Sequence, residues 1–142
     1  MKKLRPQRTD FDRIARYLAG AEKKLQAARK VLIIDEEASY QLAYEAMLKA
    51  SLGFMLSFGV RPRSLPGHHV TIIEFAGERL GAEFKHLISM FDRMRRKRRQ
   101  AIYEVDGFIS TTEVRQAINS AEQYLNVISD TIQQKNPQSK LL

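Results

Sequence analysis

The chain has 142 residues, 44% of them hydrophobic, and this length and composition suit one domain with a substantial core. It contains no cysteine, which excludes disulfides, thiolate metal sites and a cysteine nucleophile. Its formal net charge of +8 favours polyanionic partners, such as nucleic acid or anionic lipid.

The first ten residues, MKKLRPQRTD, are basic, but no apolar stretch follows them, so we expect no signal peptide. No window of apolar residues is long enough to span a bilayer, so we expect no membrane partner and a cytoplasmic protein. We predict a basic N-terminal extension over residues 1–8, one helical domain over residues 9–134 and a flexible tail over residues 135–142.

Helical periodicity dominates the domain, and no strand pattern is found. The first predicted helix opens at Thr9, which stands three residues before Asp12 in a weak capping-box pattern. Its apolar residues follow one seam at steps of three and four: Phe11, Ile14, Leu18, Ala21, Leu25, Ala28 and Leu32. The second helix, within DEEASYQLAYEAMLKASLGFMLSFG, has a wide apolar surface and is predicted to be the most buried, with Gly59 ending it.

Three further helices are predicted after the loop VRPRSLPGHH. A short helix runs from about His69 to Leu80, and a fourth begins near Ala82 and carries the basic run RMRRKRRQAIYE, residues 93–104. The capping box STTE, residues 110–113, opens the fifth helix, whose seam is Val114, Ile118, Ala121, Leu125, Ile128 and Ile132. We therefore predict an all-α fold, an antiparallel bundle of four long helices plus one short helix.

The basic run divides on a helical wheel drawn at about 100° per residue. Arg96 and Lys97 fall outside the apolar stripe and are interpreted as solvated charges, whereas Arg95 and Arg98 fall inside it. The stripe itself is defined by Phe84, Leu87, Ile88, Phe91, Ile102 and Val105.

The two inward arginines need an explanation, because an unpaired buried charge is costly. Acidic partners are available on the second helix in Glu36, Glu37 and Glu45. Two interpretations stay open. The arginine stems reach water over apolar neighbours where the bundle splays, or the arginines form a basic cleft that grips phosphate.

The order of these helices resembles the HEPN superfamily, small α-helical bundles that are common in prokaryotic toxin–antitoxin and defence systems. The resemblance covers about residues 10–134. It rests on YLAGAEKKLQAARKVL, on YQLAYEAMLKASLGFMLSFG, on a short helix that opens at a His, and on a late helix with an arginine motif. The family's motif is an Arg, usually a polar residue, and then a His after a short spacer; in many members these residues cleave RNA without metal in a cleft between two protomers.

The best register of the motif is RRQAIY, in which Arg98 matches the motif Arg and Arg99 the polar position. Tyr103 stands in the place of the His, as in some branches of the family. The resemblance implies that Arg98 stabilises phosphorane charge and that Tyr103 donates a proton or hydrogen bond, or stacks on a base. Tyrosine is a poor base, since its reference pKa is about 10. His69 becomes a replacement base if the fold brings it near Arg98; otherwise His68 and His69 serve capping and loop hydrogen bonds.

Three functions follow as expectations. The favoured one, because Tyr103 replaces the base, is a HEPN-like protein of a toxin–antitoxin or defence-type system that binds RNA or another polyanion. Its basic cleft on the fourth helix would comprise Arg93, Arg95, Arg96, Lys97, Arg98 and Arg99. The second is a metal-independent endoribonuclease toxin that uses Arg98 and Tyr103 of a homodimer. The third is a non-catalytic interaction bundle covered by an acidic antitoxin or a nucleotidyltransferase-like protein. We expect no cofactor and no metal site.

Overall fold

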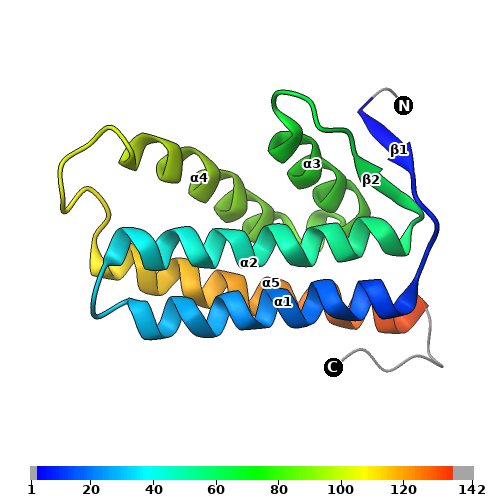
Figure 1. Cartoon of the computed structure of the whole chain (residues 1–142), viewed down its shortest axis with the longest axis horizontal. Coiled ribbons are helices and arrows are strands. Elements are labelled where there is room, and N and C mark those ends of the chain that lie inside the picture. Colours follow the sequence, from blue (N-terminus) through cyan, green and yellow to red (C-terminus); the bar gives the residue numbers. More distant parts are fainter. Residues whose placement is uncertain (1–2, 136–142) are drawn as a thin grey trace.

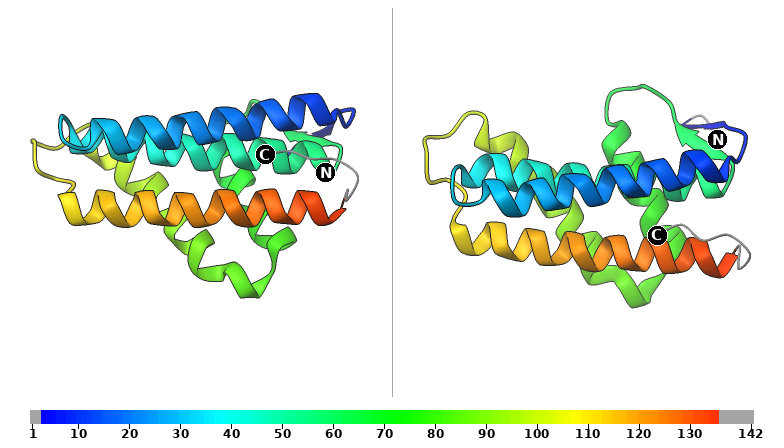
Figure 2. Two further views of the ribbon diagram at one scale, coloured as in Figure 1. Left: turned by 90° about the horizontal axis from the view of Figure 1, so that it is seen from below. Right: turned by 60° about the horizontal axis from the view of Figure 1, so that its bottom comes forward.

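Three long helices lie side by side in the computed structural model, which describes residues 3–135 (Figure 1). These are α1 (Phe11–Val31), α2 (Glu36–Ser57) and α5 (Thr111–Lys135), with α1 antiparallel to the other two (Figure 2). The remaining elements are β1 (Leu4–Pro6), β2 (Val60–Pro62), α3 (His68–Leu80), the short 3-10 helix η1 (Ala82–Phe84) and α4 (Lys85–Ala101). The mainly helical class is confirmed.

The helices α3 and α4 form a bent arm rather than two further parallel members of the row. Both pack on α2, and α4 also reaches α5. His69 at the start of α3 and Arg98 in the C-terminal half of α4 both contact Tyr44 of α2. No helix among the described residues has the length and apolarity needed to cross a membrane.

The helix starts follow local capping chemistry. Asp10 caps α1 by accepting hydrogen bonds from the amides of Asp12 and Arg13, at 3.0 and 3.3 Å. The predicted start at Thr9 is wrong by one residue, because the Thr9 hydroxyl instead donates to the Leu56 carbonyl, 3.2 Å away.

The capping box that opens α5 is confirmed. The Glu113 amide donates to Ser110 Oγ at 3.1 Å, and the Ser110 amide donates to Glu113 Oε1 at 3.0 Å. Gly59 ends the second helix as expected, with φ of +73°, a conformation that glycine adopts without steric cost.

The small sheet was not expected from the sequence. The strands β1 and β2 pair antiparallel in the register Leu4 with Pro62 and Arg5 with Arg61, so part of the predicted N-terminal extension is held against the body of the protein. Strands of three residues that end in proline are too short to show an alternating pattern. Residues 1, 2 and 136–142, which include nearly all of the predicted tail, lie outside the described part of the chain.

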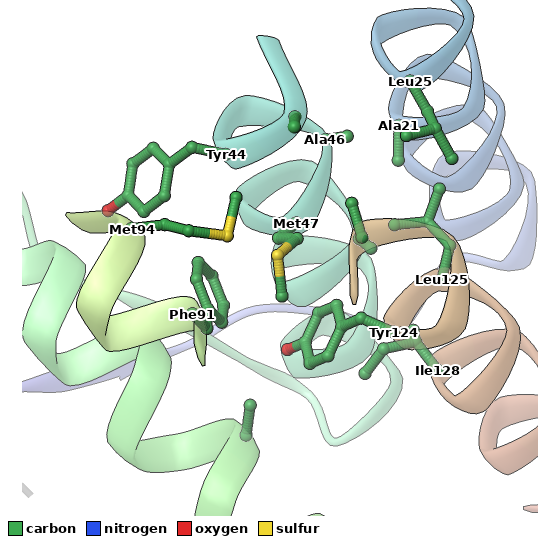
Figure 3. Packing of buried hydrophobic residues seen from close by; sticks show 14 of the residues in the cluster. Ala21, Leu25, Tyr44, Ala46, Met47, Phe91, Met94, Tyr124, Leu125 and Ile128 are labelled. Atoms are coloured by element: carbon green, nitrogen blue, oxygen red, sulfur yellow. The ribbon is translucent and has the colours of Figure 1, made fainter. Parts of the chain in front are cut away.

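The core is centred on α2, as predicted. Its apolar side chains meet α1, α5 and α4, and Figure 3 shows Phe91 of α4 packing between Tyr44 of α2 and Tyr124 of α5, with Met47 of α2 beside them. The helix α1 approaches α2 closely at Gly53, where an added Cβ would stand 3.1 Å from Tyr17 Cβ. The seams predicted for α1 and α5 face this core.

The fourth helix is shorter than predicted. It ends at Ala101, and a turn follows in which the Tyr103 amide donates to the Gln100 carbonyl at 3.0 Å. Ile102 is 67% exposed and Val105 is also exposed, so extending the apolar stripe to these two residues was wrong. Gly107, with φ of +89°, then redirects the chain toward α5.

Candidate anion-binding site

The basic run on α4 divides by what each side chain contacts. Arg95 is 16% exposed, and its Nε donates to Asp92 Oδ1 at 2.9 Å. Arg96 is 64% exposed and lies 3.4 Å from the other oxygen of the same carboxylate. The inward direction of Arg95 and the outward direction of Arg96 are thus confirmed, but the acid that meets them is on their own helix. Arg93 is exposed and points away from the core.

Lys97 is not the solvated charge that the helical wheel predicts. Its Nζ lies 2.7 Å from Glu113 Oε2 and 4.6 Å from the centre of the Phe108 ring. The hydrogen bond from Lys97, together with the Ser110 amide, lowers the pKa of Glu113. The chain that leaves α4 turns back over Lys97 and brings the first turn of α5 to it, which a wheel of a single helix does not represent.

Arg98 lies on the inner side of α4, as the wheel predicts, but without the acids expected to pair with it. Glu36 accepts a hydrogen bond from Thr111, and Glu45 pairs with Lys24. The Arg98 guanidinium instead lies 4.7 Å from the centre of the Tyr44 ring. Its Nε is buried and has no hydrogen-bond partner among the described residues.

A cavity of about 260 Å³ opens beside Arg98, where the N-terminus of α3 faces α4. We call it the Arg98 cavity; its walls are Gly67, His68, His69, Val70, Arg95, Arg98 and Arg99. The fold therefore does bring the histidine pair to Arg98. Three arginines line this opening, of which Arg95 is paired with Asp92, while Arg98 and Arg99 form no ion pair with a described residue. Guanidinium groups of this kind are suitable donors for phosphate oxygens.

His69 is held in the neutral form at this site. Its Nδ1 is 2.9 Å from the Tyr44 hydroxyl. Burial, followed by the positive charges of His68 and Arg98, lowers the pKa of His69 to about 4. Burial also raises the pKa of Tyr44 to about 12, although the nearby Arg98 opposes this rise. Near neutral pH both groups are uncharged and able to exchange hydrogen bonds, so the positive charge of the cavity comes from its arginines.

Tyr103 lies outside this arrangement. It is 87% exposed in the turn that follows α4, and it does not line the Arg98 cavity. Its predicted role beside Arg98 stays a prediction for a cleft that two chains would share.

Tyr44 is the site residue that the sequence analysis missed. It fits the apolar seam of α2 and reads as an ordinary core residue, and its bond to His69 joins positions 25 residues apart. No local signal in the sequence indicates that contact.

A second cavity of about 260 Å³ lies where Arg98 faces the first turns of α2. We call it the Glu37 cavity; its walls are Asp35, Glu37, Ala38, Tyr40, Gln41, Arg98, Ile102 and Ile109. Arg98 is the one residue common to both walls. Across residues 3–135, no group of three or more His, Asp or Glu side chains is arranged to hold a metal ion.

Comparisons with protein-family models, curated proteins and solved structures found no match to this chain.

Proposed function

We propose that this chain is a HEPN-like protein that binds single-stranded RNA through the Arg98 cavity. The observation that carries the proposal is the buried Nε of Arg98, which has no hydrogen-bond partner among residues 3–135. A desolvated donor of this kind is costly unless something outside the chain satisfies it. A phosphate group does so best, because the guanidinium fork matches two phosphate oxygens.

The surroundings of Arg98 support a phosphate in particular. Arg95 and Arg99 line the same cavity, and Arg93 and Arg96 add positive charge along α4, whereas Lys97 is paired with Glu113. A run of cations on one helix suits a polymer with regularly spaced phosphates better than a single small anion. The histidines of the cavity add donors and ring faces for the sugar and the bases.

The biological setting of the proposal rests on the resemblance to HEPN proteins. It comprises a toxin–antitoxin or defence-type system, a homodimer, and an acidic antitoxin or nucleotidyltransferase-like partner. The basic face of α4 supplies the charge that an acidic partner would complement.

Binding of a fluorescent single-stranded RNA, followed by anisotropy over a range of salt concentrations, tests this function. Each phosphate contact on a single strand contributes about 0.7 to the slope of log affinity against log salt. We expect the slope measured for the wild type to correspond to several such contacts. Arg98→Ala should bind more weakly, and its slope should be smaller by the contribution of about one contact. A wild-type affinity that does not depend on salt concentration, or an unchanged slope in Arg98→Ala, would overturn the proposal.

A second candidate function is metal-independent cleavage of the bound RNA, and neutral His69 is the observation that favours it. When the Nδ1–H donates to Tyr44, Nε2 carries the lone pair and can accept the proton of a ribose 2′-OH. Arg98 would then stabilise the charge on the pentacoordinate phosphorus.

Incubation of RNA with the purified protein in EDTA tests this candidate. Cleavage that is lost in both Arg98→Ala and His69→Gln supports it, and cleavage undiminished in both contradicts it. Tyr103→Phe is the informative third variant, because loss of cleavage there would favour a two-chain cleft in which Tyr103 acts.

A further inference from the structure

The Glu37 cavity holds two polar side chains on one face of α2. Glu37 and Gln41 are four residues apart, so they lie one above the other on the helix surface. Neither side chain makes a hydrogen bond or ion pair with any described residue, whereas the neighbouring Asp35 is occupied as the cap that accepts from the Ala38 amide at 3.1 Å.

Arg98 and the exposed Glu37 both line this cavity and form no ion pair with each other. Opposite charges that line one opening and stay apart leave room for a ligand between them. Such a ligand must offer an anionic group to Arg98 and hydrogen-bond donors to Glu37. A nucleotide meets both needs, with its phosphate on Arg98 and the edge of its base on α2.

The chemistry of the two α2 side chains selects among the bases. The Watson–Crick edge of guanine presents N1–H and N2–H as adjacent donors, which one carboxylate accepts together, and O6 as an acceptor beside them. Glu37 supplies that carboxylate, and the Gln41 amide supplies a donor for O6. Adenine and cytosine pair their single amino group with a ring nitrogen lone pair, which repels the second carboxylate oxygen, and uracil has one N–H between two carbonyls.

The remaining walls suit a flat base. The exposed Ile102 and the buried Ile109 contribute apolar surface to the walls. Each of the two cavities lined by Arg98 measures about 260 Å³, just below the range of about 300–1,000 Å³ that is usual for small-ligand sites.

We propose that the Glu37 cavity is a guanine subsite in which Glu37 and Gln41 read the base while Arg98 holds the phosphate of the same nucleotide. This inference rests on the proposed RNA-binding function and deepens it. It makes the protein selective for a guanine at one position of a single strand, whereas the other arginines of α4 contact phosphates irrespective of sequence.

Anisotropy with four labelled RNA octamers tests the subsite. One is oligouridine, and the others carry a single G, A or C in the same uridine background. We expect the wild type to bind the G octamer about tenfold more tightly than the others, the discrimination typical of one bidentate base contact. Glu37→Gln should bring the four affinities to within about twofold of one another, since its amide donors oppose those of guanine.

Glu36→Gln is the matched control, because it makes the same charge change one residue away at a side chain that does not line the Glu37 cavity. We expect it to keep the preference for G. Equal binding of the four octamers by the wild type, or a preference that survives in Glu37→Gln, would overturn the guanine subsite.

Arg98→Ala separates the subsite from the function on which it rests. If this variant weakens binding of all four octamers and the wild type lacks a preference for G, the subsite fails and the RNA site stands. If Arg98→Ala binds all four octamers as the wild type does, both fail.

Discussion

Two regions of the molecule differ in how their buried polar groups are satisfied. One is the interface of α2 with α1 and α5, and the other is the C-terminal half of α4. Between α1 and α2, the Ser39 hydroxyl donates to the Ala28 carbonyl at 2.6 Å. Between α2 and α5, Ser51 donates to the Met47 carbonyl at 2.7 Å and accepts from the Tyr124 hydroxyl at 2.6 Å.

On α4, by contrast, the buried Nε of Arg98 has no partner among residues 3–135. The first region satisfies its polar groups within the chain and contributes stability. The second region keeps a buried donor that no described residue satisfies. Substitutions in the two regions should therefore separate stability from binding.

The largest expected effect is a loss of stability in the core. Phe91 is fully buried, and its ring packs edge-on against Tyr44 and Tyr124, with ring centres 5.6 and 5.2 Å apart (Figure 3). We expect Phe91→Ala to lower the free energy of unfolding by about 3–5 kcal/mol, measured by urea denaturation. Ser89→Ala, at an exposed position of the same helix, should change it by less than about 0.5 kcal/mol. Equal losses in the two variants would contradict the packing described for α4.

A smaller loss should follow from removing a single buried hydroxyl. Tyr124→Phe deletes the donor to Ser51 and should cost about 1–3 kcal/mol, because the serine oxygen stays buried. Tyr17→Phe provides the comparison, since the half-exposed Tyr17 hydroxyl makes no hydrogen bond with the described residues. Denaturation curves that coincide for Tyr124→Phe and the wild type would show that this hydrogen bond does not stabilise the fold.

Lowering the pH should cost stability through His69. Its pKa is near 6.5 in the unfolded chain and about 4 in the folded chain. Between these values the unfolded chain binds more protons, so the free energy of unfolding falls as the pH is lowered through this window. The half-exposed ring limits the effect at pH 5 to on the order of 1 kcal/mol.

Urea denaturation of the wild type and His69→Gln at pH 7 and pH 5 measures this contribution. The wild type should lose more stability than the variant between the two pH values. Identical losses would mean that His69 is not held in its neutral form by the fold.

The smallest effect concerns the ion pair that the helical wheel did not predict. A double-mutant cycle with Lys97→Met and Glu113→Gln should give a coupling free energy of about 0.5–1 kcal/mol, because both side chains are partly buried. The same cycle with Arg96 and Asp92, which lie at a longer separation and more exposed, should give less. A larger coupling for Arg96 and Asp92 would contradict the conclusion that Lys97 is held in place by Glu113 whereas Arg96 is largely solvated.

The sequence predicts the long helices well, because each of them carries an apolar seam that repeats over many turns. The apolar seams of α1 and α5 continue for many turns, and Ser110 and Glu113 mark the start of α5 by local chemistry alone. The end of α4 was missed for the complementary reason. Ile102 and Val105 continue the spacing of the seam, but the chain has already turned away from the core at Ala101.

For the candidate site, the sequence predicts the direction in which Arg98 points but not the residues that surround it. The phase of α4 places Arg98 inward, and this holds in the structure. The contacts that define the site join α4 to the start of α3 and to Tyr44 in the middle of α2. Such contacts depend on how the arm of α3 and α4 is set across α2, which the period of any one helix does not specify.

The most direct test of the account compares Arg98→Met with Arg96→Met by urea denaturation and by RNA binding. Methionine keeps an unbranched stem, so Arg98→Met loses a cation–π contact with Tyr44 and removes an unsatisfied donor, and these two effects oppose each other. The account predicts that Arg98→Met keeps its free energy of unfolding within about 1 kcal/mol of the wild type and loses at least tenfold in RNA affinity. Arg96→Met should change both quantities little. A loss of several kcal/mol in Arg98→Met with unchanged RNA affinity would contradict the account, because Arg98 would then be a structural residue.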